Sequence, residues 1–276
     1  MQFSLDSLAA LATILGTAIS ILALVQSRAW LLLISFLLVC SSLVIGWYAR
    51  QKRAVLSSAS IVIEGHSIDS LNIANLRRRI NRTFTVQKIH HEVRIEAEDM
   101  QITWRYSGFC RADQVSSMEF SIDSDEGTPF EQLNCVAFDL GRDPGMAHPI
   151  RPILVGTEGI SKKVSVPFLE TLNANEPFGI LLKCTLPRCV KAGFGYYTST
   201  SSFGQSRVPQ CTVHLIFIGS KPKWMRVYES AGKTSSRLLK TLAPTSFETD
   251  RTEYIDVVSN REGQSARIYA FWRDSI

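Results

Sequence analysis

Two long apolar runs near the N-terminus constrain this chain more than any other feature of its sequence. Residues 7–27 and 29–49 each extend for 21 residues without a charged side chain, and Arg28 alone separates them. At a rise of 1.5 Å per residue, a helix of that length would reach about 31 Å, roughly the thickness of a hydrocarbon core. The sequence therefore predicts a two-helix transmembrane hairpin over residues 1–53. The alternative is a single span followed by a surface helix.

The basic residues around these runs predict an orientation. Arg50, Lys52 and Arg53 follow the second run, whereas Arg28 stands alone in the expected turn. Cations accumulate on the cytoplasmic side of membrane spans. Both termini are therefore expected in the cytoplasm.

Small residues form a stripe along the first run. Thr13, Gly16 and Ser20 recur at intervals of three and four, and such stripes allow helices to approach closely within a membrane. They predict packing within one hairpin or, alternatively, packing between subunits of a homo-oligomer around a wet pore. A tetramer is among the assemblies expected.

The remainder of the chain, residues 54–276, has the pattern of a single β-rich domain. Its charges nearly balance, with 26 Lys and Arg against 24 Asp and Glu, so bulk charge predicts no partner. Short β-type runs alternate with turn residues, which predicts an all-β sandwich or a partly open barrel. Strands are expected at 59–64, 91–97, 100–106, 116–122, 134–140, 150–155, 162–168, 178–186, 211–218, 224–228, 254–258 and 267–272, and helices at 67–79 and 235–242.

Catalytic and metal-binding patterns are missing from the sequence. His90 and His91 are adjacent, so on a strand they would point to opposite faces and could not share a metal. The spacing of Cys184 and Cys189 has no matching second pair, and free thiols are expected for the cysteines. We predict a protein that is not an enzyme and needs no cofactor or metal.

The densest basic cluster is the first candidate for a ligand-binding site. It comprises Arg77, Arg78, Arg79, Arg82 and Lys88. Arginine side chains match phosphate oxygens, so the cluster is typical of sites for nucleotides or for anionic lipid head groups. The alternative is a solvated helix end, because cations also stabilise a helix C-terminus.

A second candidate lies in the segment 194–207, which is rich in Ser and Thr. Its aromatic residues Tyr196 and Tyr197 could stack on nucleic-acid bases, and its hydroxyl groups could bond sugar or phosphate. The alternative is an ordinary Ser-rich hairpin loop. The sequence leaves both interpretations open.

The two apolar runs, the basic segment Arg50–Arg53 and the β-rich remainder together resemble a class of bacterial antiphage proteins. These are the two-transmembrane β-domain effectors of nucleotide-signalling systems of the CBASS and Hailong types. A Gly-x-Trp element expected at the start of a CBASS-type barrel is missing after residue 54, which favours the Hailong type.

The resemblance implies a function and a location. A nucleotidyltransferase encoded nearby would make a nucleotide second messenger, an oligomeric or cyclic deoxyadenylate or a related cyclic oligonucleotide. This ligand would bind the β-domain and open an ion channel in the bacterial inner membrane, which would depolarise the cell. The alternative is a membrane-anchored β-sandwich that binds a protein partner and has no channel activity.

Overall fold

The computed structural model describes residues 37, 40, 41, 61–68, 80–124, 128–141, 147–158, 160–230 and 236–274. The chain divides into two compact units, residues 1–59 and 60–276. In the first unit the description covers only Leu37, Cys40 and Ser41, where the backbone is helical. All of the described strands lie in the second unit.

The prediction of a transmembrane hairpin requires correction. Across the described residues, no helix combines the length and the apolar character needed to cross a membrane. Hydropathy reports only that a run is apolar, whereas a span also needs a continuous helix. This finding overturns the predicted hairpin, ion channel and multi-pass inner-membrane location with cytoplasmic termini. Most of the predicted spans, including Thr13, Gly16 and Ser20, lie outside the described residues.

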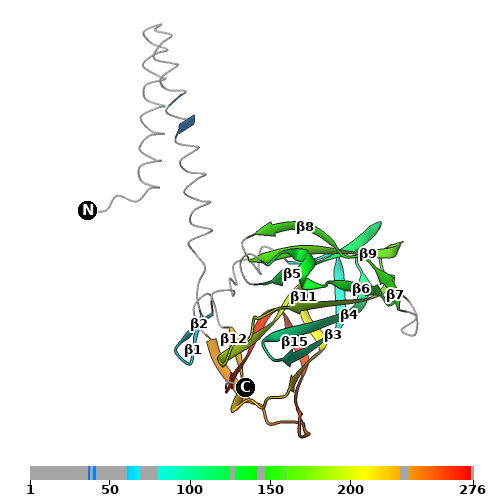
Figure 1. Ribbon diagram of the computed structural model, residues 1–276. Coiled ribbons are helices and arrows are strands. Elements are labelled where there is room, and N and C mark those ends of the chain that lie inside the picture. The colour runs from blue at the N-terminus through cyan, green and yellow to red at the C-terminus, as the bar shows by residue number, and fades with distance from the viewer. Residues whose placement is uncertain are drawn as a thin grey trace, which may run out of the picture. The chain divides into compact units, whose positions relative to one another are not determined.

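The second unit is built from strands, as predicted (Figure 1). The strands are β1 (Ile61–Ile63), β2 (His66–Ile68), β3 (Phe84–Glu96), β4 (Asp99–Cys110), β5 (Val115–Asp123), β6 (Val136–Asp139), β7 (His148–Ile150), β8 (Ile153–Glu158), β9 (Ser161–Leu172), β10 (Pro177–Leu186), β11 (Gly193–Ile218), β12 (Trp224–Ser230), β13 (Ser236–Thr241), β14 (Ser246–Phe247) and β15 (Arg251–Arg273). One 3-10 turn, η1 (Phe130–Leu133), precedes β6.

These strands form three sheets. The largest has the order β13-β12-β15-β11-β3-β4-β10-β6-β7, with β14 paired to β15, and it contains ten strands. A second sheet has the order β5-β9-β8, and β1 and β2 form a separate hairpin. Most pairs are antiparallel, but β3 and β11 run parallel from Lys88 and Gln210 onwards. The all-β prediction for this part of the chain is confirmed.

The two longest strands, β11 and β15, form an antiparallel ribbon that folds back on itself. Tyr269 donates a hydrogen bond to the Asp256 carboxylate at 2.8 Å, although both residues belong to β15. A straight strand would hold residues 13 positions apart at about 43 Å. Phe217 and Phe271 also meet, at 5.0 Å between ring centroids. The ribbon therefore contributes to two layers with the core between them.

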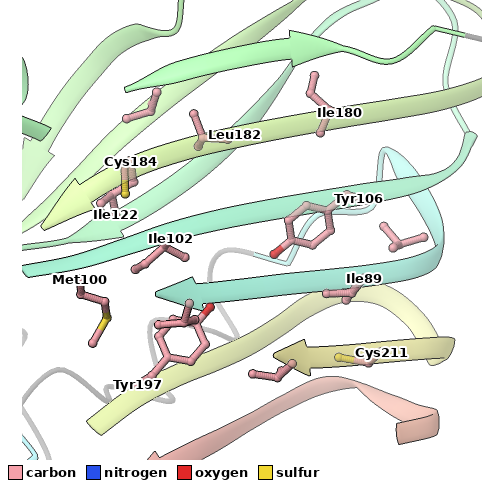
Figure 2. Packing of buried hydrophobic residues seen from close by; sticks show 14 of the residues in the cluster. Ile89, Met100, Ile102, Tyr106, Ile122, Ile180, Leu182, Cys184, Tyr197 and Cys211 are labelled. Carbon is pink, nitrogen blue, oxygen red and sulfur yellow. The ribbon is translucent and has the colours of Figure 1, made fainter. Parts of the chain in front are cut away.

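The main core lies between the folded ribbon, strands β3, β4 and β10, and the smaller sheet. Figure 2 shows Ile102, Tyr106, Ile180 and Leu182 from β4 and β10 among its side chains. Met118 of β5 and the buried valines of β9 complete it from the smaller sheet. Alternation of buried and exposed residues along β3 and β4 explains why the sequence reads as strands there.

The hairpin β1–β2 covers the outer side of the ribbon. Ile61, Ile63 and Ile68 are almost fully buried and form a second apolar cluster with residues of β12 and β15. Glu64, in the turn of the hairpin, accepts hydrogen bonds from Arg226 at 2.5 Å and from the Tyr228 hydroxyl at 2.6 Å. Strand β2 overlaps the start of the helix predicted at 67–79, so that prediction is wrong at its first residues.

Candidate functional site

The sharp bend in the ribbon creates the most distinctive local geometry of the domain. Ser202 pairs with Gln264 and Arg207 pairs with Glu262, so four residues of β11 face the single residue Gly263. We call residues 203–206 of β11 and 261–264 of β15 the corner. A bulge of this kind bends both strands and turns side chains to new directions.

The corner is fastened to the segment that leads into β3. The Asn81 amide donates to Ser202 at 2.8 Å, and the Gly204 amide donates to Asn81 at 2.8 Å. The Gln205 side chain accepts a hydrogen bond from the Val86 amide at 2.7 Å and donates one to the Val86 carbonyl at 2.5 Å. The side-chain amide thus replaces a missing rung of the sheet and fixes the corner beside residues 81–86.

A shallow depression of about 280 Å³ opens at the surface of the corner. It is lined by Gln205, Ser206, Arg207, Glu262 and Gln264. The Arg82 side chain lies against the same bulge, because a Cβ added at Gly204 would meet Arg82 Cγ at 2.9 Å. Lys88 lies at the start of the β3–β11 pairing, opposite Gln210. All three cations, Arg82, Lys88 and Arg207, are exposed.

The corner also contains a buried arginine next to the lining residue Glu262. Arg261 is 3% exposed, and its guanidinium donates to the hydroxyl and the carbonyl of Ser199, at 2.8 and 2.5 Å. It also donates to the Ser265 hydroxyl at 2.9 Å and to Cys211 Sγ at 3.3 Å. No ion pair among the described residues includes Arg261. Within the described residues, the hydrogen-bond donors of the Arg261 guanidinium are therefore paired with neutral acceptors.

A chain of aromatic hydrogen bonds continues from the corner into the core. Trp104 donates to the Tyr197 hydroxyl at 3.2 Å, so Tyr197 is free to donate to His91 Nδ1, 2.8 Å away. His91 Nε2 lies 3.0 Å from the Tyr106 hydroxyl. With Nδ1 as an acceptor, Nε2 carries the proton and donates to Tyr106. Every polar atom of the His91 ring is thereby satisfied.

Burial holds this chain in its neutral form. Burial, with Arg261 and His90 nearby, lowers the pKa of His91 well below 6.5. Burial likewise raises the pKa of the Tyr106 and Tyr197 hydroxyls. A general base needs a pKa near neutrality, and here the pKa values move away from it. The arrangement is typical of a structural network.

The pKa of His91 gives the domain an expected pH dependence. The unfolded chain takes up a proton near pH 6.5 that the folded chain excludes. The free energy of unfolding is then unaffected by His91 above that pH. It falls by about 1.4 kcal/mol for each pH unit below it. Urea unfolding measured between pH 7.5 and 5 should show this loss, and His91→Gln should remove the part due to His91. An unchanged slope in His91→Gln would contradict the assignment, and His148→Gln, at an exposed histidine, is the matched control.

The structure brings some of the predicted site residues together and separates others. Arg82 and Lys88 lie beside the corner, whereas Arg77, Arg78 and Arg79 fall outside the described residues. Tyr197 is 5% exposed and bonded within the core, where a base could not stack on it without displacing its neighbours. Tyr196 points to the other side of β11, packed beside Phe194.

The sequence anticipated only part of the lining of the depression. Gln205, Ser206 and Arg207 fall within the candidate segment 194–207, although the roles proposed there were given to its aromatic and hydroxyl groups. Glu262 and Gln264 were not predicted, and Gln205 is bonded to a residue 119 positions away. Gly204 and Gly263, which permit the close approach of the two strands, were a further signal. Within the described part of the chain, no group of His, Cys, Asp or Glu residues could hold a metal ion.

Comparisons with known proteins add only distant structural similarities. No protein-family model matches the chain, and no curated protein matches it. Solved structures of an M1 zinc metallopeptidase from Deinococcus radiodurans match 68% of this chain, with 13% identity and a TM-score of 0.40. A mutant of that enzyme bound to a Tyr-Ser-Ala substrate matches equally weakly, at 12% identity and a TM-score of 0.40. The chain spans less than half of these proteins, 42–43% of their length, and similarity at this level carries no argument about function.

Proposed function

We propose that the β-domain binds a phosphate-bearing ligand at the corner, and that this ligand is a nucleotide second messenger of an antiphage system. The observation that carries the proposal is a polar depression lined by Arg207, with the Arg82 side chain against the same bulge and Lys88 opposite Gln210 of the same strand. These cations come from segments more than 100 residues apart, so the fold, rather than local sequence, assembles them.

The chemistry of the corner fits such a ligand. Guanidinium groups donate paired hydrogen bonds to phosphate oxygens, and a lysine adds a point charge. The amide side chains of Gln205 and Gln264 can bond sugar hydroxyls or base edges. Glu262 is the acidic group of the lining, and it disfavours anions that lack compensating contacts. The sequence resemblance supplies the class of nucleotide, a short deoxyadenylate oligomer.

Charge reversal at the corner should weaken binding strongly. The probe is a fluorescently labelled linear deoxyadenylate trimer, titrated into the purified full-length chain and followed by anisotropy. Each charge-assisted hydrogen bond contributes about 1.5–3 kcal/mol, so Arg82→Glu and Arg207→Glu should each raise the Kd about 10–100-fold. Binding should also weaken as salt is added.

Lys191→Glu provides the matched control, because Lys191 is an exposed cation in the segment between β10 and β11. It changes the net charge by the same amount and should leave the Kd within about twofold. If all three variants bind alike, the cations of the corner are not the site. If the wild-type chain binds neither this trimer nor a cyclic deoxyadenylate, the ligand class is wrong.

A second candidate function is the binding of a protein partner along the edge of β15. Strand β14 pairs only with Thr252 and Glu253, and beyond them Ile255 and Val257 are 39% and 59% exposed. Exposed apolar residues on a strand edge are typical of sites that pair with another chain. Failure of both nucleotide probes would favour this function. The expected nucleotidyltransferase partner and the homo-oligomer stay predictions.

A further inference from the structure

Two cysteines face each other where β6 joins β10. The register of these antiparallel strands pairs Ala137 with Leu182 and Val136 with Lys183. Continued by one residue, the same register places Cys135 directly opposite Cys184. Ala137 and Leu182 are buried, and side chains two positions along a strand share a face. Both thiols therefore point to the core side.

The hydrogen-bond pattern of the pair fixes the distance between the two residues. The Leu140 amide donates to the Gly179 carbonyl at 2.9 Å, which makes that pair a hydrogen-bonded one. Hydrogen-bonded and non-bonded pairs alternate along an antiparallel ladder, so Cys135 and Cys184 form a non-bonded pair. Such pairs hold their Cα atoms about 4.5 Å apart, within the range that a disulfide requires, about 4.4–6.8 Å.

The two thiols also influence each other's acidity. A side-chain interaction between them lowers the pKa of the Cys135 thiol and raises that of the Cys184 thiol, and Cys189 adds to the rise at Cys184. The remaining described thiols of the domain have other surroundings: Cys110 donates to Ala112 at 3.1 Å, and Cys211 lies beside Arg261. Figure 2 shows Cys184 next to Ile122 on the core side of β10.

We propose that Cys135 and Cys184 are an oxidisable pair that forms a reversible disulfide when the protein meets a peroxide. The Cys135 thiolate attacks one oxygen of hydrogen peroxide, the O–O bond breaks, and Cys135 becomes a sulfenic acid as one water leaves. The Cys184 sulfur then attacks the Cys135 sulfur, the S–O bond breaks and a second water leaves. The two thiols lose two electrons, which reduce the peroxide to water.

The exposure of the two thiols and their pKa values indicate which one reacts with the peroxide and which one resolves the sulfenic acid. Cys135 is half-buried and accessible to a small oxidant, whereas Cys184 is 3% exposed. The interaction with Cys184 lowers the pKa of the Cys135 thiol, and that interaction together with burial raises the pKa of Cys184. The more exposed and more acidic thiol reacts first, and the buried thiol resolves the sulfenic acid.

Peptide mapping tests this inference without any mutation. The full-length chain is treated with hydrogen peroxide, its remaining thiols are alkylated, and it is digested under non-reducing conditions. The expected product is one peptide pair joined through Cys135 and Cys184, which dithiothreitol separates again. A Cys135 that stays fully alkylatable, or one joined to Cys189 instead, would overturn the proposal.

Two variants separate the roles of the thiols. In Cys184→Ser the resolving thiol is gone, so dimedone should trap a sulfenic acid on Cys135 and no cross-link should form. In the control Cys110→Ser the cross-link should form to the same extent as in the wild-type chain. Dimedone labelling of Cys184 in place of Cys135 would contradict the assigned order. None of these readouts depends on nucleotide binding, so they stand apart from the proposed function.

Discussion

Arg261→Met is expected to lower the free energy of unfolding by about 2–4 kcal/mol, the first of the two largest effects that we predict. Methionine fills much of the same volume but donates no hydrogen bond. The carbonyls of Ser199 and Ser265 would then lie buried without their donor. Each such acceptor costs about 1–3 kcal/mol, and removal of a buried charge offsets part of that loss.

Urea unfolding of the two proteins, followed by tryptophan fluorescence, measures this difference. Arg237→Met is the matched control, because the Arg237 side chain is 71% exposed and pairs with Glu229 at the surface. Exposed pairs of this kind contribute about 0–1 kcal/mol. If Arg261→Met were as stable as the control, the guanidinium would not be what holds the corner together.

Gly263→Ala is expected to destabilise the domain by about 3–5 kcal/mol, through a clash of backbone atoms. A Cβ at this position would lie 1.8 Å from the carbonyl oxygen of Gln205 and 3.2 Å from that of Phe203. Neither atom belongs to a flexible side chain, so β11 and β15 would have to separate. The bonds between Gln205 and Val86 would be lost as well.

The control for this substitution is Gly156→Ala, since a Cβ at Gly156 would meet nothing within 4 Å. That variant should unfold within about 0.5 kcal/mol of the wild type. Thermal unfolding by circular dichroism distinguishes the two variants. A Gly263→Ala protein as stable as Gly156→Ala would show that the strands at the corner can adapt at little cost.

Much of the sheet could be predicted because its strands alternate. His91–Ala97 and Met100–Tyr106 read as a hairpin, and β3 and β4 form it with buried residues at every second position. Strand β13 was missed, since residues 235–242 read as a helix. Pairing with β12 determines its structure, a tertiary contact that local propensity does not contain.

The Ser-rich half of β11 shows why composition misled the interpretation of residues 194–207. Serines and glycines read as a loop, yet Ser199 and Ser201 are fully buried on the inner side of the strand. Their hydroxyls bond Arg261 and the Gly263 carbonyl, so small polar residues suit that side. Because the buried positions of this strand carry hydroxyl groups that bond a buried cation, the sequence lacks the alternation of apolar and polar residues that predicts a strand.

The candidate site could be anticipated only in part. Arg82 and Lys88 stand out because they are close in the sequence, whereas Arg207 lies three residues before the point where the β3–β11 pairing begins. That pairing is a register between distant strands, and a single sequence contains no direct sign of it. The cysteine pair was hidden for the same reason, because 49 positions separate Cys135 from Cys184.

The folded ribbon also has a consequence for how the chain reaches this structure. Strand β3 pairs with β11, and β11 pairs with β15. Residues near 90 therefore have their partners more than 120 positions later in the chain. Closing such long loops costs conformational entropy before the strand contacts form. Domains dominated by pairings between distant strands therefore fold in about milliseconds to seconds. During synthesis, β3 and β4 therefore lack a partner strand on the β3 side until β11 has left the ribosome.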